Sequence, residues 1–160
     1  MGAMNRFLCV MILAGVAMGV AAGACAADLK SPDLVKVALG KLAREYSDMQ
    51  RKLAADRYDR LPHENQEFQE ESAALRDAIA NEPADFKATV QAALERTRTA
   101  STRVADVSAT HDKKQVGSAL ESLATLLTSL NALFPESLRV EPALSAAAIP
   151  TTAYPAGSGP

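Results

Sequence analysis

Apolar residues after Asp28 recur at alternating steps of three and four, the spacing that places side chains along one face of an α-helix. The pattern continues to about Pro135 and shows no strand-like alternation of apolar and polar residues. It divides into four segments, each expected to form one helix: Pro32 to about Arg60, Pro62 to about Ala80, Pro83 to Val107, and about Val116 to Pro135. The pattern therefore predicts an all-α protein.

Prolines and one capping residue mark the borders of these segments. Ser31 offers a capping hydroxyl, and Pro32 suits the first helical position. Pro62 lacks an amide donor and crowds the preceding turn, so it should separate the first two helices. Because the connections are short, neighbouring helices should be antiparallel. This predicts an up-down-up-down four-helix bundle over residues 27–139.

The first helix is expected to bury an apolar seam and to expose its charges. The seam consists of Val35, Leu39, Leu42, Tyr46, Met49 and Leu53. The charged residues are expected on a solvated face rich in local ion pairs. They are Arg44, Glu45, Asp48, Arg51, Lys52, Asp56, Arg57, Asp59 and Arg60.

An apolar run precedes the helices. Arg6 is followed by FLCVMILAGVAMGVAAGACA, which ends in small residues, the layout of a secretory signal peptide. Cleavage before Ala27 would assign residues 1–26 to the signal peptide and export the mature protein, with a bacterial periplasm as the expected compartment. Alternatively, Ala22 to Cys25 is similar to a lipobox, and a lipidated Cys25 would anchor the mature N-terminus. A transmembrane helix is disfavoured because the second half of the run is mostly Gly and Ala.

The composition of the chain also limits which partners and metal sites are expected. Residues 140–160 are rich in Pro, Ala, Gly and Ser, which predicts a disordered tail. The formal net charge is −2, so nucleic acid is not an expected partner. The two cysteines, Cys9 and Cys25, lie in the leader, so the mature domain should contain no disulfide and no thiolate metal site.

Imidazole chemistry must use His63 or His111, the two histidines of the chain. With Glu64 and Asp112 they are candidate ligands of a zinc or copper ion, since both histidines are expected at the same end of the bundle. Each of these residues also has an interpretation that is purely structural. Glu64 suits the solvated first turn of a helix, and Asp112 with Gln115 forms a capping box. His111 continues the third seam and would then be a partly buried residue at a helix end.

The start AADL and the final segment KKQVGSALESLATLLTSLNALFPESLR give the chain a resemblance to periplasmic four-helix bundles of the cytochrome b562 and cytochrome c-prime type. The resemblance implies the bundle fold. Those families ligate haem with a histidine near the end of the last helix, whereas residues 134–139 here contain none. Met49 is a possible haem ligand, although methionine more often fills a core.

These observations favour an exported, haem-free, non-enzymatic bundle that acts by binding, with a protein partner in the envelope or a role in envelope stress. No cofactor is expected, apart from a possible divalent metal ion. A metal-binding bundle that uses His63 and His111 and a b-type haem electron carrier are the alternatives. An enzyme is not expected, because no nucleophile and no paired acid and base can be placed in the sequence.

Overall fold

The computed structural model describes residues 29–140 of the 160-residue chain. The predicted signal peptide, Cys25 and residues 141–160 lie outside this range. The described part contains four α-helices, two short 3-10 helices and no strand, which confirms the all-α class. The elements are α1 (Pro32–Ala54), η1 (Tyr58–Arg60), α2 (Leu61–Ala78), α3 (Ala84–Ser108), α4 (Lys113–Asn131) and η2 (Glu136–Leu138).

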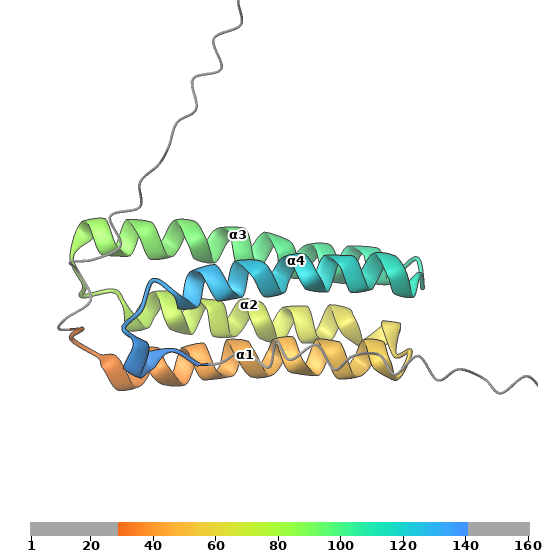
Figure 1. Ribbon diagram of the computed structural model, residues 1–160, viewed down its shortest axis with the longest axis horizontal. Coiled ribbons are helices and arrows are strands. Elements are labelled where there is room, and N and C mark those ends of the chain that lie inside the picture. The colour runs from red at the N-terminus through yellow and green to blue at the C-terminus, as the bar shows by residue number, and fades with distance from the viewer. Residues whose placement is uncertain (1–28, 141–160) are drawn as a thin grey trace, which may run out of the picture.

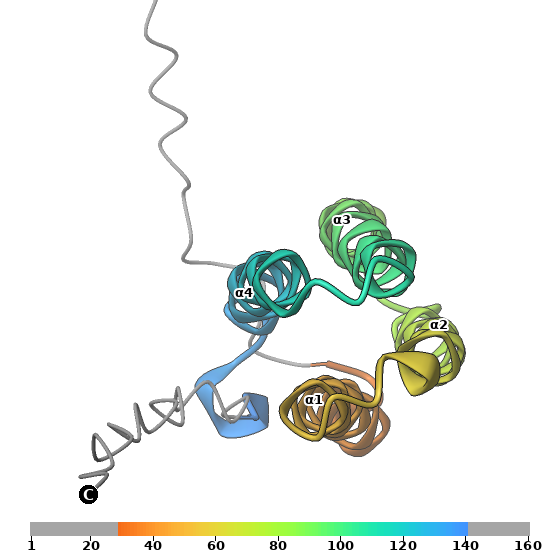
Figure 2. The same ribbon diagram turned by 90° about the vertical axis from the view of Figure 1, so that its right-hand side faces the viewer.

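The four helices lie side by side along their length (Figure 1). Seen end-on, they surround a common centre in chain order, and η2 lies beside α1 near the gap between α1 and α4 (Figure 2). None of the helices between residues 29 and 140 is long and apolar enough to cross a membrane.

The core follows the predicted apolar seams. Five seam residues of α1 are buried: Val35, Leu39, Leu42, Tyr46 and Met49. Aromatic rings are few but central, since Phe68 and Phe134 are almost fully buried. The Phe86 and Phe134 rings meet edge to face, with their centroids 5.8 Å apart. This geometry suits the electrostatics of two aromatic rings.

The first helix ends at Ala54, not near Arg60 as the pattern predicts. Asp56 adopts a left-handed conformation with φ 54°. Its amide donates to the Leu53 carbonyl, and the Arg57 amide donates to the Lys52 carbonyl. These are the two hydrogen bonds of a Schellman motif, which usually has glycine where Asp56 stands. Pro62 does not cause the break but lies in the first turn of α2.

The start of α4 confirms the predicted cap at Asp112. Its Oδ1 accepts hydrogen bonds from the amides of Lys114 (2.9 Å) and Gln115 (3.1 Å). The reciprocal bond differs from that of a capping box, because Gln115 Nε2 donates to Asp112 Oδ2 at 2.9 Å. The Asp112 amide donates instead to Thr110 Oγ1. These bonds hold the pKa of Asp112 below its usual value, chiefly through the Gln115 amide and side chain.

The fourth helix ends at Asn131, four residues before the predicted border at Pro135. The chain then folds back, which leaves Phe134 buried although it is no longer helical. The Asn131 side chain holds both polar groups of the Val140 backbone. Its Nδ2 donates to the Val140 carbonyl (2.8 Å), and its Oδ1 accepts from the Val140 amide (3.2 Å). We call this pair of bonds the Asn131 clamp.

Candidate functional site

The two histidines occupy separate, exposed positions. His63 Nε2 lies 3.7 Å from Glu67 Oε1, one turn further along α2. The His111 ring stacks on Tyr58, with 5.1 Å between centroids and 12° between planes. Among the described residues, neither histidine belongs to a group of three or more potential ligands with atoms within 4.8 Å of one another. The partial burial predicted for His111 is wrong, because this residue is exposed.

The other two predicted metal ligands also serve separate elements. Asp112 caps α4, and Glu64 is buried against α1, where Lys52 Nζ lies 3.6 Å from its Oε1. The structure thus does not bring His63, His111, Glu64 and Asp112 into one such group of ligand atoms. A zinc or copper site at these residues stays a prediction.

His111 instead belongs to a cluster that joins the end of α1 to the start of α4. Lys113 Nζ lies 2.9 Å from Asp56 Oδ1, and the Tyr58 hydroxyl donates to the same oxygen at 3.2 Å. The hydrogen bond and charge of Lys113 lower the pKa of Asp56. Both left-handed residues of the described chain, Asp56 and His111, lie in this cluster. The side chains of this cluster contact one another, so the cluster connects elements rather than offering a binding site.

Several titratable side chains converge between α1 and α2. They are Glu45 and Asp48 from α1 and Glu64 and Glu67 from α2, and we call this group the acidic seam. One carboxylate oxygen from each of Glu45, Asp48 and Glu64 lies within 4.8 Å of the others. Glu45 and Glu64 are only 6% exposed. Two of these carboxylates are thus largely removed from water.

Cations approach the acidic seam mostly from its rim. Arg44 Nε lies 3.9 Å from both Glu45 Oε1 and Asp48 Oδ2, beyond hydrogen-bonding distance. Arg51 contacts Asp48, and its side chain and that of Arg44 are about three-quarters exposed. Ion pairs of such exposed groups stabilise a protein only weakly. The buried carboxylates are therefore incompletely compensated.

Glu45 shows this imbalance most clearly. Burial raises the pKa of its carboxyl, and the charge of Glu67, within hydrogen-bonding reach, raises it further. Glu45 Oε2 is buried without a hydrogen-bond partner. One turn away, Lys41 Nζ pairs with Glu71 Oε1 at 2.9 Å, but Glu71 Oε2 is also buried without a partner. Between α1 and α2, buried carboxylate oxygens thus remain without a hydrogen-bond donor.

The sequence interpretation missed the acidic seam, since it placed Glu45 and Asp48 on a solvated face and Glu64 in a solvated first turn. That placement is wrong: Glu45 and Glu64 are buried, and Asp48 is only partly exposed. A signal was present in α2, where Glu64 lies three residues after Leu61 and four before Phe68, both fully buried. Glu64 thus occupies a seam position that its polarity concealed.

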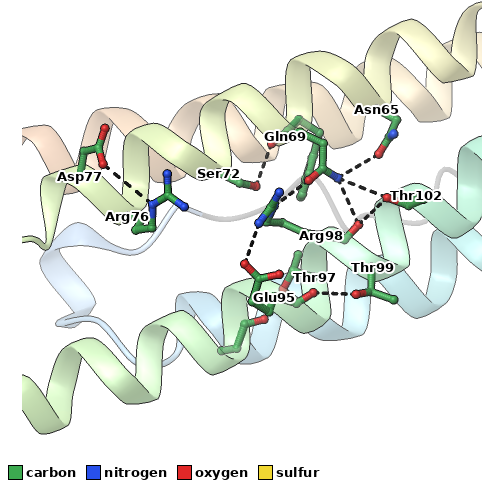
Figure 3. Close-up of polar contacts among 12 residues, drawn as sticks. Asn65, Gln69, Ser72, Arg76, Asp77, Glu95, Thr97, Arg98, Thr99 and Thr102 are labelled. Carbon is green, nitrogen blue, oxygen red and sulfur yellow. Dashed lines mark hydrogen bonds and ion pairs between the residues drawn. The ribbon is translucent and has the colours of Figure 1, made fainter.

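The opposite side of α2 carries a polar network in which donors and acceptors match (Figure 3). Gln69 Nε2 donates to Asn65 Oδ1 and to the Arg98 carbonyl. Arg98 returns hydrogen bonds of 2.6 Å from Nε to Gln69 Oε1 and from Nη1 to Glu95 Oε1. Neutral amides and a guanidinium thus fix α3 against α2. The contrast singles out the acidic seam as the interface that lacks partners.

Two further features bear on the predicted functions. A groove of about 350 Å³ lies between α3 and α4 and is lined by Ala100, Arg103, Val107, Gln115, Ser118, Ala119 and Ser122. Met49, the candidate haem ligand, is fully buried and does not line this groove. On the outer face of α1, Leu34 and Val37 are large apolar residues exposed to 61% and 57%.

No family model, curated protein or solved structure matches the chain. The resemblance to periplasmic bundles of the cytochrome b562 type thus stays a prediction. The function must be argued from the residues themselves.

Proposed function

We propose that the protein is exported and acts as a non-enzymatic binding protein, with the outer face of the first half of α1 as its contact surface for a protein partner. The observation that carries this proposal is the exposure of Leu34 and Val37. They lie three residues apart and therefore project from one side of the helix. Paired exposed apolar side chains of this size favour a contact that covers them.

Charges around this surface define the partner further. Lys36 on α1 and Lys30 just before this helix are exposed, and Asp33 is the nearby exposed acid. A partner that covers Leu34 and Val37 would therefore present an apolar centre with an acidic rim. Such complementarity raises the association rate and the specificity of a contact.

The frame that we propose for this surface is an antiparallel up-down-up-down four-helix bundle behind a signal peptide of residues 1–26. Contacts between α1 and α2 support the antiparallel arrangement. Lys41 pairs with Glu71, and Lys52 further along α1 pairs with Glu64, earlier in α2. Between antiparallel helices, a residue later in one helix is expected to contact a residue earlier in the other. The leader pattern supports export.

The contact surface is tested with a photo-crosslinking amino acid at Val37 in living cells and a matched probe at Thr99, which is exposed on α3. We expect a crosslinked partner from position 37 and none from position 99. The purified partner should then bind Leu34→Ser or Val37→Ser about five- to thirtyfold more weakly, since burying such a partly exposed side chain contributes about 1–2 kcal/mol.

Because Leu34 and Val37 are exposed, neither serine variant should lower the melting temperature of the protein by more than about three degrees. Equal crosslinking from both positions, or unchanged affinity of both serine variants, would contradict the proposal. Loss of folding in the variants would instead show that Leu34 and Val37 stabilise the bundle itself.

A further inference from the structure

We propose that the acidic seam between α1 and α2 binds one divalent cation of calcium's size, with Glu45, Asp48 and Glu64 as ligands and Glu67 beside them. This inference does not rest on the binding function proposed above. It concerns a different interface and a different class of ligand. It also differs from a histidine site, because Glu64 is the single residue that the two sites have in common.

The spacing of the four carboxylates supports a shared ion. Glu45 and Asp48 are three residues apart on α1, and Glu64 and Glu67 are three residues apart on α2. Residues at this spacing lie on one face of a helix, so each helix turns two carboxylates toward the other. Carboxylates that converge from facing helices are a recurring way to hold metal ions inside helical bundles.

The unpaired oxygen of Glu45 is an independent observation. The Glu45 side chain is 7% exposed, and its Oε2 has no hydrogen-bond partner. The carboxyl lies within hydrogen-bonding reach of Glu67, which is also an acceptor when ionised. Two facing acceptors need either a proton or a cation between them. A buried polar atom left without a partner is costly, so the site is built to receive a positive group.

The donor set indicates the kind of cation. All converging ligands are carboxylate oxygens, which hard cations prefer, and the group contains neither His nor Cys. Two oxygens bound to one calcium ion, each at about 2.3–2.6 Å, are at most about 5 Å apart. The three oxygens of the seam lie within 4.8 Å of one another and satisfy this limit. Small rotations of the three side chains would therefore bring these oxygens onto one calcium ion without separating the helices.

An ion can also reach the seam. The Asp48 side chain is 15% exposed and links the buried carboxylates to the surface. Arg44 and Arg51 lie at this opening with side chains about three-quarters exposed, so they can turn into solvent when an ion enters. Lys52 Nζ, 3.6 Å from Glu64 Oε1, belongs to a side chain that is 39% exposed and can likewise turn away. Binding therefore requires side-chain movement and no backbone rearrangement.

The experiment is a titration of the purified, EDTA-treated full chain with calcium chloride, followed by isothermal calorimetry and by thermal unfolding. We expect a saturable heat for one ion per chain and a melting temperature that rises with calcium concentration, because an ion that binds only the folded state stabilises it. Glu45→Gln and Glu64→Gln should each weaken calcium binding at least about tenfold, since each removes a charged ligand.

Three matched controls distinguish the acidic seam from calcium binding elsewhere on the protein. Glu95→Gln removes an exposed carboxylate on α3 that pairs with Arg98, and it should leave calcium binding unchanged. His63→Ala and His111→Ala should also leave it unchanged, which distinguishes the seam from a histidine site. Asp48→Asn, at the more exposed ligand, provides a further test if a glutamine variant does not fold.

Absence of both heat and stabilisation up to about 10 mM calcium, beyond the usual range of calcium modules outside the cell, would overturn the proposal. Calcium binding that survives in Glu45→Gln and Glu64→Gln would equally overturn it, because the ion would then lie elsewhere. Neither result would bear on the contact surface of α1.

Discussion

At the scale of single residues, Glu45 has the least favourable environment for its charge. Burial and the neighbouring Glu67 both raise the pKa of its carboxyl. The folded protein thus holds this proton more tightly than the unfolded chain does. Ionising Glu45 costs stability, and the cost appears as the pH rises from the unfolded-state pKa through the folded-state pKa.

This cost predicts that Glu45→Gln stabilises the calcium-free protein at neutral pH. The amide has nearly the same shape and supplies a donor to the neighbouring carboxylates. We expect a gain of about 1–3 kcal/mol at about pH 7.5, the usual cost of an unpaired buried polar group. At about pH 4 the gain should nearly vanish, because Glu45 is then protonated in the wild type.

Urea unfolding of both proteins at the two pH values, in the presence of EDTA, measures this difference. Glu95→Gln is the control, since its carboxylate is exposed and its substitution should change stability little at either pH. An equal effect of Glu45→Gln at both pH values would show that the charge of Glu45 is not the cause.

At the scale of elements, the helix ends are where sequence and structure differ most. The apolar seam of α1 predicts five of its buried residues, because helical periodicity and burial have the same cause, but it misses the buried Glu45. It also does not predict that α1 ends at Ala54, since the residue that turns the chain is Asp56 and not a glycine. A left-handed aspartate has no reliable sequence signal, whereas glycine at such a position does.

The acidic seam was missed because it depends on which helices lie next to each other. Its carboxylates look like ordinary solvated charges, and only the pairing of α1 with α2 shows that they face each other. Sequence alone predicts which face of a helix is buried, but not which helix packs against that face. The cap at Asp112 could be predicted because its partners, Lys114 and Gln115, lie within three residues. The local cap at Asp112 was thus predictable, whereas the contact between α1 and α2 was not.

The left-handed residue at the end of α3 permits a test at this scale. His111 has φ 55°, which is unfavourable for every residue with a Cβ atom. His111→Gly and His111→Ala both lose the stacking on Tyr58, but only glycine is free of this strain. We therefore expect His111→Gly to be more stable than His111→Ala by about 1 kcal/mol.

Thermal unfolding of the two variants at equal concentration would measure this difference. A matched pair at Ala109, which has an ordinary helical conformation at the C-cap of α3, provides the control. There glycine should be no better than alanine. Equal stability of the two His111 variants would indicate that the turn relaxes when the ring is removed.

At the scale of the whole molecule, the first question is which N-terminus the mature protein has. We expect the protein recovered from a bacterial envelope fraction to have the intact mass of residues 27–160, because the small residues before Ala27 suit signal cleavage. Native mass spectrometry makes this measurement. A diacylglycerol addition on Cys25 would show instead that the chain is anchored to a membrane, and the added mass of a haem would contradict a haem-free protein.

The Asn131 clamp has a consequence for the far end of the chain. It fixes Val140, the last residue that the structure describes, beside Leu39 and Ala43 of α1. In sequence, the last twenty residues therefore follow a residue that is bonded to the end of α4 and lies against α1, the helix that carries Leu34 and Val37. Any binding sequence among them shares a high local concentration with a partner held on α1, of the kind that a short linker provides. Weak contacts at the two places could then combine into one strong attachment.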